Sequence, residues 1–153
     1  MRTSRTLVAF AIVAALVSAC RARPAATPAD SGFAAMQSRG HMAMGVDQYT
    51  STHTFDALQD GGRITLVRDP SDSVGVAQIR AHLRLIQHAF QAGDFSTPAF
   101  VHMKTMPGTD VMASRRAVIT YAYTDVPGGG EVRITSRDST ALAAIHAFMG
   151  AQR

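Results

Sequence analysis

The chain has no tryptophan and only one cysteine, Cys20, among its 153 residues. Disulfides, thiolate metal sites and cysteine nucleophiles are therefore excluded from everything that follows this residue. Acidic residues are also few, since 11 Asp and Glu face 15 Lys and Arg, and Glu131 is the only glutamate. The basic residues are scattered along the chain, so the sequence lacks the clustered positive charge typical of nucleic-acid binding, and we expect no nucleic-acid partner.

Catalytic motifs are also absent from the sequence. It contains no G-x-S-x-G, no H-E-x-x-H and no phosphate-binding Walker loop. Asp56, Asp60, Asp69 and Asp72 fall at expected strand ends and turns, where this residue is common for structural reasons. The sequence therefore favours a binding or interaction domain over an enzyme. A small histidine-dependent enzyme, with His82 or His146 as the base, is a further alternative.

The N-terminal residues have the pattern of an export signal. Arg2 and Arg5 precede an uncharged apolar run at residues 7–17, which is short for a membrane span. Residues 17–20, Val-Ser-Ala-Cys, resemble the lipobox of bacterial lipoproteins. The resemblance implies that residues 1–19 are a signal peptide and that Cys20 becomes the acylated first residue. An ordinary secreted protein with an incidental cysteine and an uncleaved helix are the alternatives.

Acylation of Cys20 would make membrane lipid a partner of the protein and place it in the bacterial cell envelope. Several acyl chains on one residue hold a protein on a membrane more firmly than a single chain does. Residues 20–32 are rich in Ala, Pro and small polar residues without a hydrophobic period, which predicts a flexible tether. Residues 33–153 are long enough for a single extracytoplasmic domain with its own core.

Two segments with the same plan predict the fold of this domain. Residues 52–58 and 63–68 alternate in polarity on either side of a Gly-rich turn, which predicts a hairpin. A helix should follow from Asp72 or Ser73 and end at Gly93. Its apolar residues recur at steps of three and four, which indicates one buried stripe: Val76, Ile79, Leu83, Ile86 and Phe90.

The second segment repeats this order. Residues 117–123 and 131–136 alternate around a turn at residues 126–130, and residues 138–150 form a helical pattern. We therefore predict an α+β fold, a four-stranded antiparallel sheet from two β-hairpin-plus-helix units with both helices on one face. The connection at residues 94–114 should contain a short packed helix and a loop, and its length makes it a candidate functional segment.

Six histidines and eight methionines provide the candidate ligands. By helical and strand periodicity His53, His82 and His146 could converge between sheet and helices, with His102 supplied by the central connection. Imidazole suits several transition metals, and thioether sulfur favours Cu(I). Two clusters mix these ligands: His41, Met42 and Met44, and His102, Met103 and Met106. The alternative is that the histidines border the core and are satisfied by backbone or hydroxyl partners.

The body of the chain resembles an uncharacterised family of small exported bacterial proteins. The resemblance rests on the runs "MGVDQYTSTHTF", "IRAHL", "GDF" and "AIHAFM", which correspond to MGFDQ, THHF, IRAHL, GDF and AIHxFL in that family. The histidines of the family fall on His53, His82, His102 and His146, and the chain departs from the pattern at Val46, Thr54 and Met103. The label aspartate carbamoyltransferase sometimes given to members is rejected, because residues 33–153 have no βαβ repeats for two α/β domains.

These observations leave two main classes of function. One is a binding module that holds a small ligand or a transition metal, with copper as the candidate cofactor, at the histidine-lined interface. The other is an interaction domain for an unknown envelope protein, which would use the central connection and residues 33–44.

Overall fold

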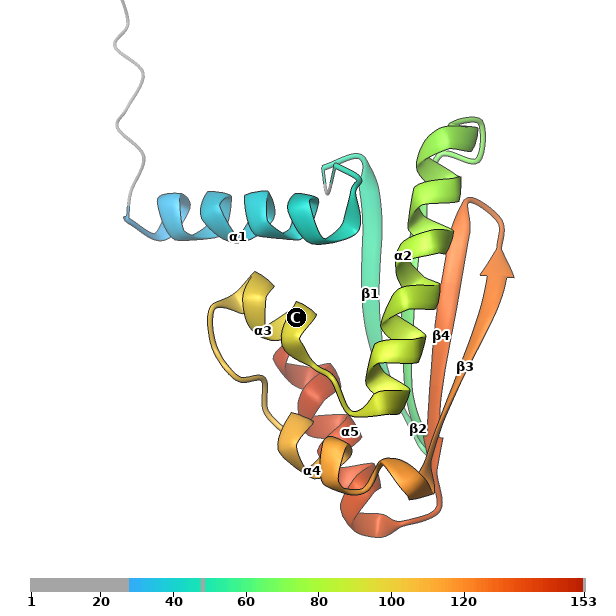
Figure 1. Ribbon diagram of the computed structural model, residues 1–153. Helices are drawn as coiled ribbons and strands as arrows, with labels where there is room; N and C mark the ends of the chain where they lie inside the picture. The colour runs from blue at the N-terminus through green and yellow to red at the C-terminus, as the bar shows by residue number, and fades with distance from the viewer. Residues whose placement is uncertain (1–27, 48, 153) are drawn as a thin grey trace, which may run out of the picture.

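The computed structural model describes residues 28–47 and 49–152 (Figure 1). The predicted signal peptide, Cys20 and the first part of the tether lie outside these residues. The described elements, in chain order, are α1 (Pro28–Met44), β1 (Ser51–Leu58), β2 (Gly61–Arg68), α2 (Ser73–Ala92), α3 (Ser96–His102), α4 (Thr109–Ser114), the 3₁₀ turn η1 (Arg116–Val118), β3 (Ile119–Val126), β4 (Gly129–Ser136) and α5 (Ser139–Ala151).

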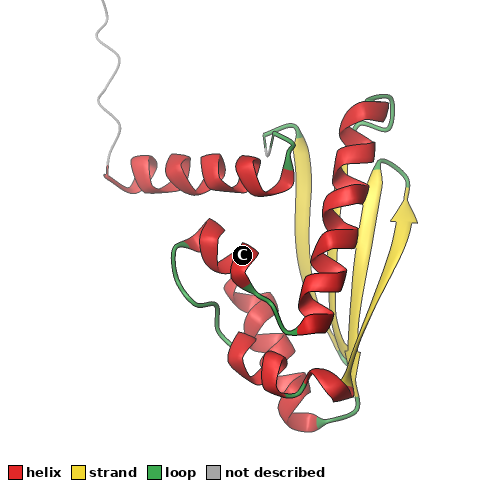
Figure 2. Ribbon diagram, in the orientation of Figure 1, coloured by secondary structure: helices red, strands yellow, loops and turns green. Residues whose placement is uncertain are grey.

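The four strands form one antiparallel sheet with the order β1-β2-β4-β3. Alternate residues of the two central strands, among them Ile64, Leu66, Val132 and Ile134, are buried beneath the helices. Figure 2 shows the helices on one side of the sheet. The predicted α+β architecture, with two hairpins and the two helices that follow them, α2 and α5, on one face, is confirmed.

Helix α2 begins and ends as its sequence predicts. The side chain of Asp72 accepts a hydrogen bond from the backbone N–H of Gly75 at 2.9 Å, and Gly93 ends the helix in the left-handed conformation with φ 86°. These are standard N-cap and C-cap arrangements. The predicted stripe of five apolar residues is buried. Helix α2 packs mainly on β3 and β4, whereas α5 packs mainly on β1 and β2.

Close packing of α5 on the sheet depends on one glycine. A Cβ atom at Gly62 would lie 2.6 Å from the Cε atom of Met149, which is too short for ordinary contact. The absence of a side chain at this position therefore lets Met149 and Ile145 rest on the start of β2. Both of these residues are fully buried.

Helix α1 was not predicted from the sequence. Residues 28–32 were expected in the tether, yet the helix starts at Pro28 and continues to Met44. Proline is favourable in the first turn of a helix because it lacks only an N–H that has no partner there. Arg39 Nε donates to the carbonyl oxygen of Val101 at 2.8 Å and joins α1 to α3. Figure 1 shows α1 projecting away from the sheet, with α3 beneath it.

The central connection is more helical than the sequence suggested. The predicted short helix is α3, but none of its residues is buried and Phe100 is 46% exposed. The expected loop at residues 106–110 contains the start of α4. Phe95 stacks on Phe90 with ring centroids 4.5 Å apart, and Phe148 meets Phe90 edge-on at 5.7 Å. These aromatic contacts attach the connection to the core. Within residues 28–47 and 49–152, no helix has the length and apolarity that crossing a membrane requires.

Candidate functional site

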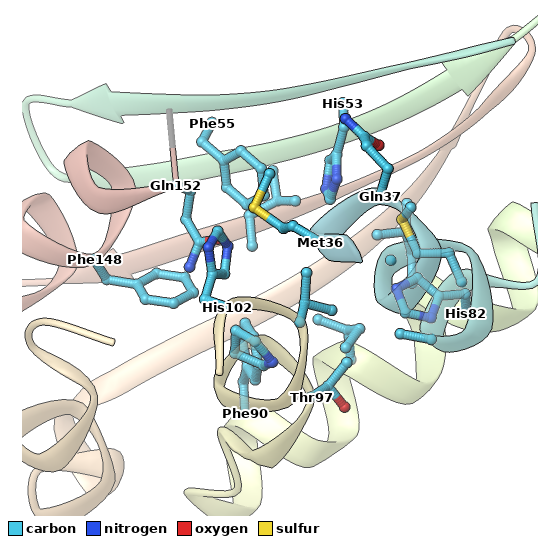
Figure 3. A pocket seen from close by; sticks show the side chains of 18 of the residues that line it. Met36, Gln37, His53, Phe55, His82, Phe90, Thr97, His102, Phe148 and Gln152 are labelled. Carbon is cyan, nitrogen blue, oxygen red and sulfur yellow. The ribbon is translucent and has the colours of Figure 1, made fainter. Parts of the chain in front are cut away.

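A cavity of about 290 Å³ lies between α1, β1, α2, α3 and α5 (Figure 3). Most of its wall is apolar, and it includes the rings of Phe33, Phe55, Phe90 and Phe148. The nineteen described residues that line it include no Asp, Glu, Lys or Arg. Its polar side chains are three imidazoles, two carboxamides and one hydroxyl: His53, His82, His102, Gln37, Gln152 and Thr97.

Helix α1 forms one complete wall of this cavity. Phe33, Met36, Gln37, Gly40 and Met44 all line it, and they recur at steps of three and four along the helix. Residues at this spacing lie on one helical face. Helix α1 therefore lines the cavity rather than covering the sheet.

His53 enters the cavity from the edge strand β1. Its ring lies 4.3 Å from that of Phe55, centroid to centroid. The residue is exposed on the edge strand, although protein atoms surround much of its ring. The surrounding protein lowers the pKa of His53 from 6.5 to about 4, mainly through burial and secondarily through His82. The imidazole is therefore neutral at pH 7.

His82 enters from α2 and contacts α1. Burial lowers its pKa, and a hydrogen bond to the backbone of Ala43 offsets part of this effect. Because that bond favours the protonated ring, the acceptor is the carbonyl oxygen of Ala43 and a ring N–H of His82 is the donor. His82 thus fixes the C-terminal half of α1 while its ring lines the cavity.

His102, the last residue of α3, pairs with Gln152 at the end of α5. Its Nε2 atom lies 2.9 Å from Gln152 Oε1, and since a carbonyl oxygen only accepts, Nε2 carries the proton. The amide nitrogen Nε2 of Gln152 is buried without a hydrogen-bond partner among the residues that the structure describes. A buried donor left unsatisfied costs about 1–3 kcal/mol.

The structure brings three of the four predicted histidines together. His53, His82 and His102 line the cavity, whereas His146 does not. The Nε2 atom of His146 lies 2.8 Å from the carbonyl oxygen of Leu58. The expected convergence of His53, His82 and His146 is therefore wrong in one member. His146 therefore lies at the end of β1, where Leu58 is the last residue of the strand.

The two clusters of histidine and methionine do not form compact sites. In the first, Met44 lines the cavity, but Met42 is 63% exposed and His41 borders a separate shallow hollow beside Asp47 and Tyr49. In the second, Met106 is buried in the core and Met103 is 69% exposed. Over the described part of the chain, no three His, Cys, Asp or Glu residues lie close enough to hold a metal ion. The copper hypothesis stays a prediction without a defined ligand set.

Several lining residues were not predicted to contribute to a site. Met36, Gln37 and Gln152 drew no attention because no motif includes them. The apolar spacing from Phe33 to Met44 was the available signal, since it is that of a helix with one buried face. Comparison of the chain with protein-family models, curated proteins and solved structures found no match. The resemblance to a family of exported proteins therefore stays a prediction.

Proposed function

We propose that this protein is a lipid-anchored, extracytoplasmic binding protein that holds a small, uncharged and largely apolar ligand. The observation that carries the proposal is the cavity beneath α1, an apolar space lined by six hydrogen-bonding side chains, which are three imidazoles, two carboxamides and one hydroxyl. This combination is typical of sites for small molecules.

The absence of charge in the cavity supports an uncharged ligand. Its lining includes no acidic or basic side chain among the residues described, and the pKa values of His53 and His82 are lowered. An ionic ligand would lose its hydration and gain no opposite charge, which is unfavourable in an apolar space. Hydroxyl, carbonyl and amide groups would lose less and would find partners in the imidazoles and carboxamides.

The cellular address is a separate part of the proposal. It depends on residues 1–20, where a positive n-region, an apolar run and a lipobox-like tetrad precede Cys20. With Cys20 acylated, the binding domain would be held at a membrane on the extracytoplasmic side. Its ligand would then reach it from the envelope.

A cavity-filling variant tests the binding function. We expect the full-length protein in lipid nanodiscs to bind naphthalene and to gain thermal stability from it, because a ligand of the native state stabilises by mass action. Ala43→Phe places a ring in the cavity and should weaken binding at least about tenfold. Ala77→Phe, at an exposed position of α2, is the matched control.

Equilibrium dialysis gives the affinity, and circular dichroism gives the unfolding midpoint of each variant. The proposal fails if naphthalene does not bind, or if Ala43→Phe folds normally and binds it as well as Ala77→Phe does.

A further inference from the structure

We propose that the ligand is a single acyl chain of a membrane lipid, which enters the cavity beside the N-terminal half of α1 while the polar headgroup stays outside. This inference rests on the proposed binding function and names the ligand class of the same cavity. The chain has two sources of the same chemistry, a phospholipid of the surrounding membrane and the acyl group proposed on Cys20.

The first argument is the shape of the cavity. Its lining on α1 extends from Phe33 to Met44, and eleven helical steps span about 16 Å. Spread over this length, a volume of about 290 Å³ leaves a mean cross-section of about 18 Å². The space is therefore long and narrow, which suits a slender molecule that lies along α1. The unbranched side chains of Met36 and Met44 adapt readily to such a molecule.

The second argument is that much of the polar lining already has partners within the protein. His102 pairs with Gln152, and a ring N–H of His82 donates to the backbone of Ala43. An occupant made of hydrocarbon leaves these bonds intact. The described lining residues include no Asp, Glu, Lys or Arg, so a charged headgroup would have no partner inside the cavity and is expected to remain outside.

The third argument is the place where the cavity opens. Along the lining face of α1, the exposed fraction falls from 53% at Phe33, through half-buried Met36, to 7% at Met44. The lining also reaches the surface at His53 on the edge strand, where the exposed group is a polar ring. The opening at Phe33 is apolar and lies on the part of α1 that projects away from the sheet (Figure 1). A hydrocarbon chain is expected to enter there.

The proposed anchor would place this opening close to lipid. Only seven residues separate Cys20 from Pro28, the first residue of α1. Phe33, and Phe100 and Met103 on or beside the helix packed against α1, are large apolar side chains that remain exposed. Exposed apolar groups of this kind are typical of surfaces that meet a membrane. A chain that passes here from bilayer to cavity avoids water, so its entry has no hydrophobic cost.

Photoactivatable chains test the inference on the full-length protein in lipid nanodiscs. In the first arm, the discs contain phosphatidylcholine with a diazirine in one chain. In the second arm, the protein is made in cells fed a diazirine palmitate and is moved into discs of ordinary lipid, so that only its own acyl group carries the label. Both arms use two probes, one with the diazirine near the carboxyl end and one with it near the far end. Mass spectrometry of peptides locates the adducts after illumination.

We expect adducts on residues that line the cavity, and the arm that gives them identifies the source of the chain. The far-end probe should label Met44 and the near-carboxyl probe should label Phe33, because the chain enters beside Phe33. Ala43→Phe fills part of the cavity and should reduce the lining adducts at least about fivefold. Ala35→Phe, at an exposed position of the same helix outside the cavity, is the matched control and should leave them unchanged.

Absence of lining adducts from both arms, in discs whose protein binds naphthalene, would overturn the inference and leave the binding function intact. The same holds if Ala43→Phe folds normally and keeps the adducts of Ala35→Phe. Far-end adducts at Phe33 together with near-carboxyl adducts at Met44 would overturn the assigned direction of entry. If neither lining adducts nor naphthalene binding is found, both the inference and the binding function fail.

Discussion

Three imidazoles face one apolar space, and each is held there in a different way. His53 lies against the ring of Phe55, His82 donates to the backbone of Ala43, and His102 donates to the carboxamide of Gln152. Burial disfavours charge on His53 and His82, so these side chains act as neutral hydrogen-bonding groups. Their chemistry at neutral pH is that of an uncharged donor and acceptor.

The neutral state of His53 predicts how stability depends on pH. Its pKa is about 4 in the folded protein and 6.5 in the unfolded chain, so on acidification the unfolded state takes up the proton first. The stability that neutral His53 contributes is complete above pH 6.5 and is lost as the pH falls toward 4. His53→Gln should therefore show a smaller fall in unfolding midpoint between pH 7 and pH 4.5 than the wild type.

The size of this effect should be less than the full pKa difference implies, because His53 is also exposed to solvent, which screens its ring. His82 contributes in the same direction, so the variant should retain some pH dependence. His88→Gln on the exposed side of α2 is the control. Identical pH profiles for His53→Gln and the wild type would show that His53 keeps an ordinary pKa.

Among the elements, α2 provides the longest contact with the sheet. Leu83 and Leu85 lie two residues apart on it, and their side chains are 1% and 69% exposed. Leu83→Ala should lower the free energy of unfolding by about 2–5 kcal/mol, because it removes buried methyl groups and leaves a cavity. Leu85→Ala should change it by no more than about 0.5 kcal/mol. Denaturant unfolding followed by circular dichroism measures both, and similar losses at the two positions would contradict the assigned face.

How far an element could be predicted depends on how local its signals are. The two hairpins were predicted because their turn residues lie between the strands that they join. Helix α2 was predicted because its capping residues, Asp72 and Gly93, lie directly at its ends. Helix α1 was missed because its partners are distant in the sequence, chiefly α3, about sixty residues further along the chain, and also α2. The exclusion of His146 from the cavity could not be predicted, because sequence periodicity does not specify how α5 is placed on the sheet.

At the scale of the whole molecule, the proposed anchor would lie close to the cavity. Seven residues separate Cys20 from the first residue of α1. Even a fully extended chain of this length spans only about 25 Å. The first folded element after the proposed lipid is therefore the helix that closes the site.

Replacement of Cys20 tests this arrangement. Cys20→Ala should abolish labelling with radioactive palmitate and prevent stable retention as a mature membrane lipoprotein, since acylation at this sulfur is the proposed anchor. Ala26→Ser in the same segment should leave both properties unchanged. Fractionation of cells with labelling of the purified protein gives the result. Full membrane retention of Cys20→Ala without palmitate would instead indicate an uncleaved apolar helix at residues 7–17.

Helices α2 and α5 each pack mainly on the strands of the other half of the chain, and this arrangement has a consequence for folding. The helix of the first half, α2, covers mainly the strands of the second half, and α5 covers mainly the strands of the first. The apolar face of each hairpin is therefore covered mainly by a helix encoded in the other half of the chain. We therefore expect neither half to complete its core alone, and an isolated fragment to need the other fragment, or a second copy of itself, for a full core.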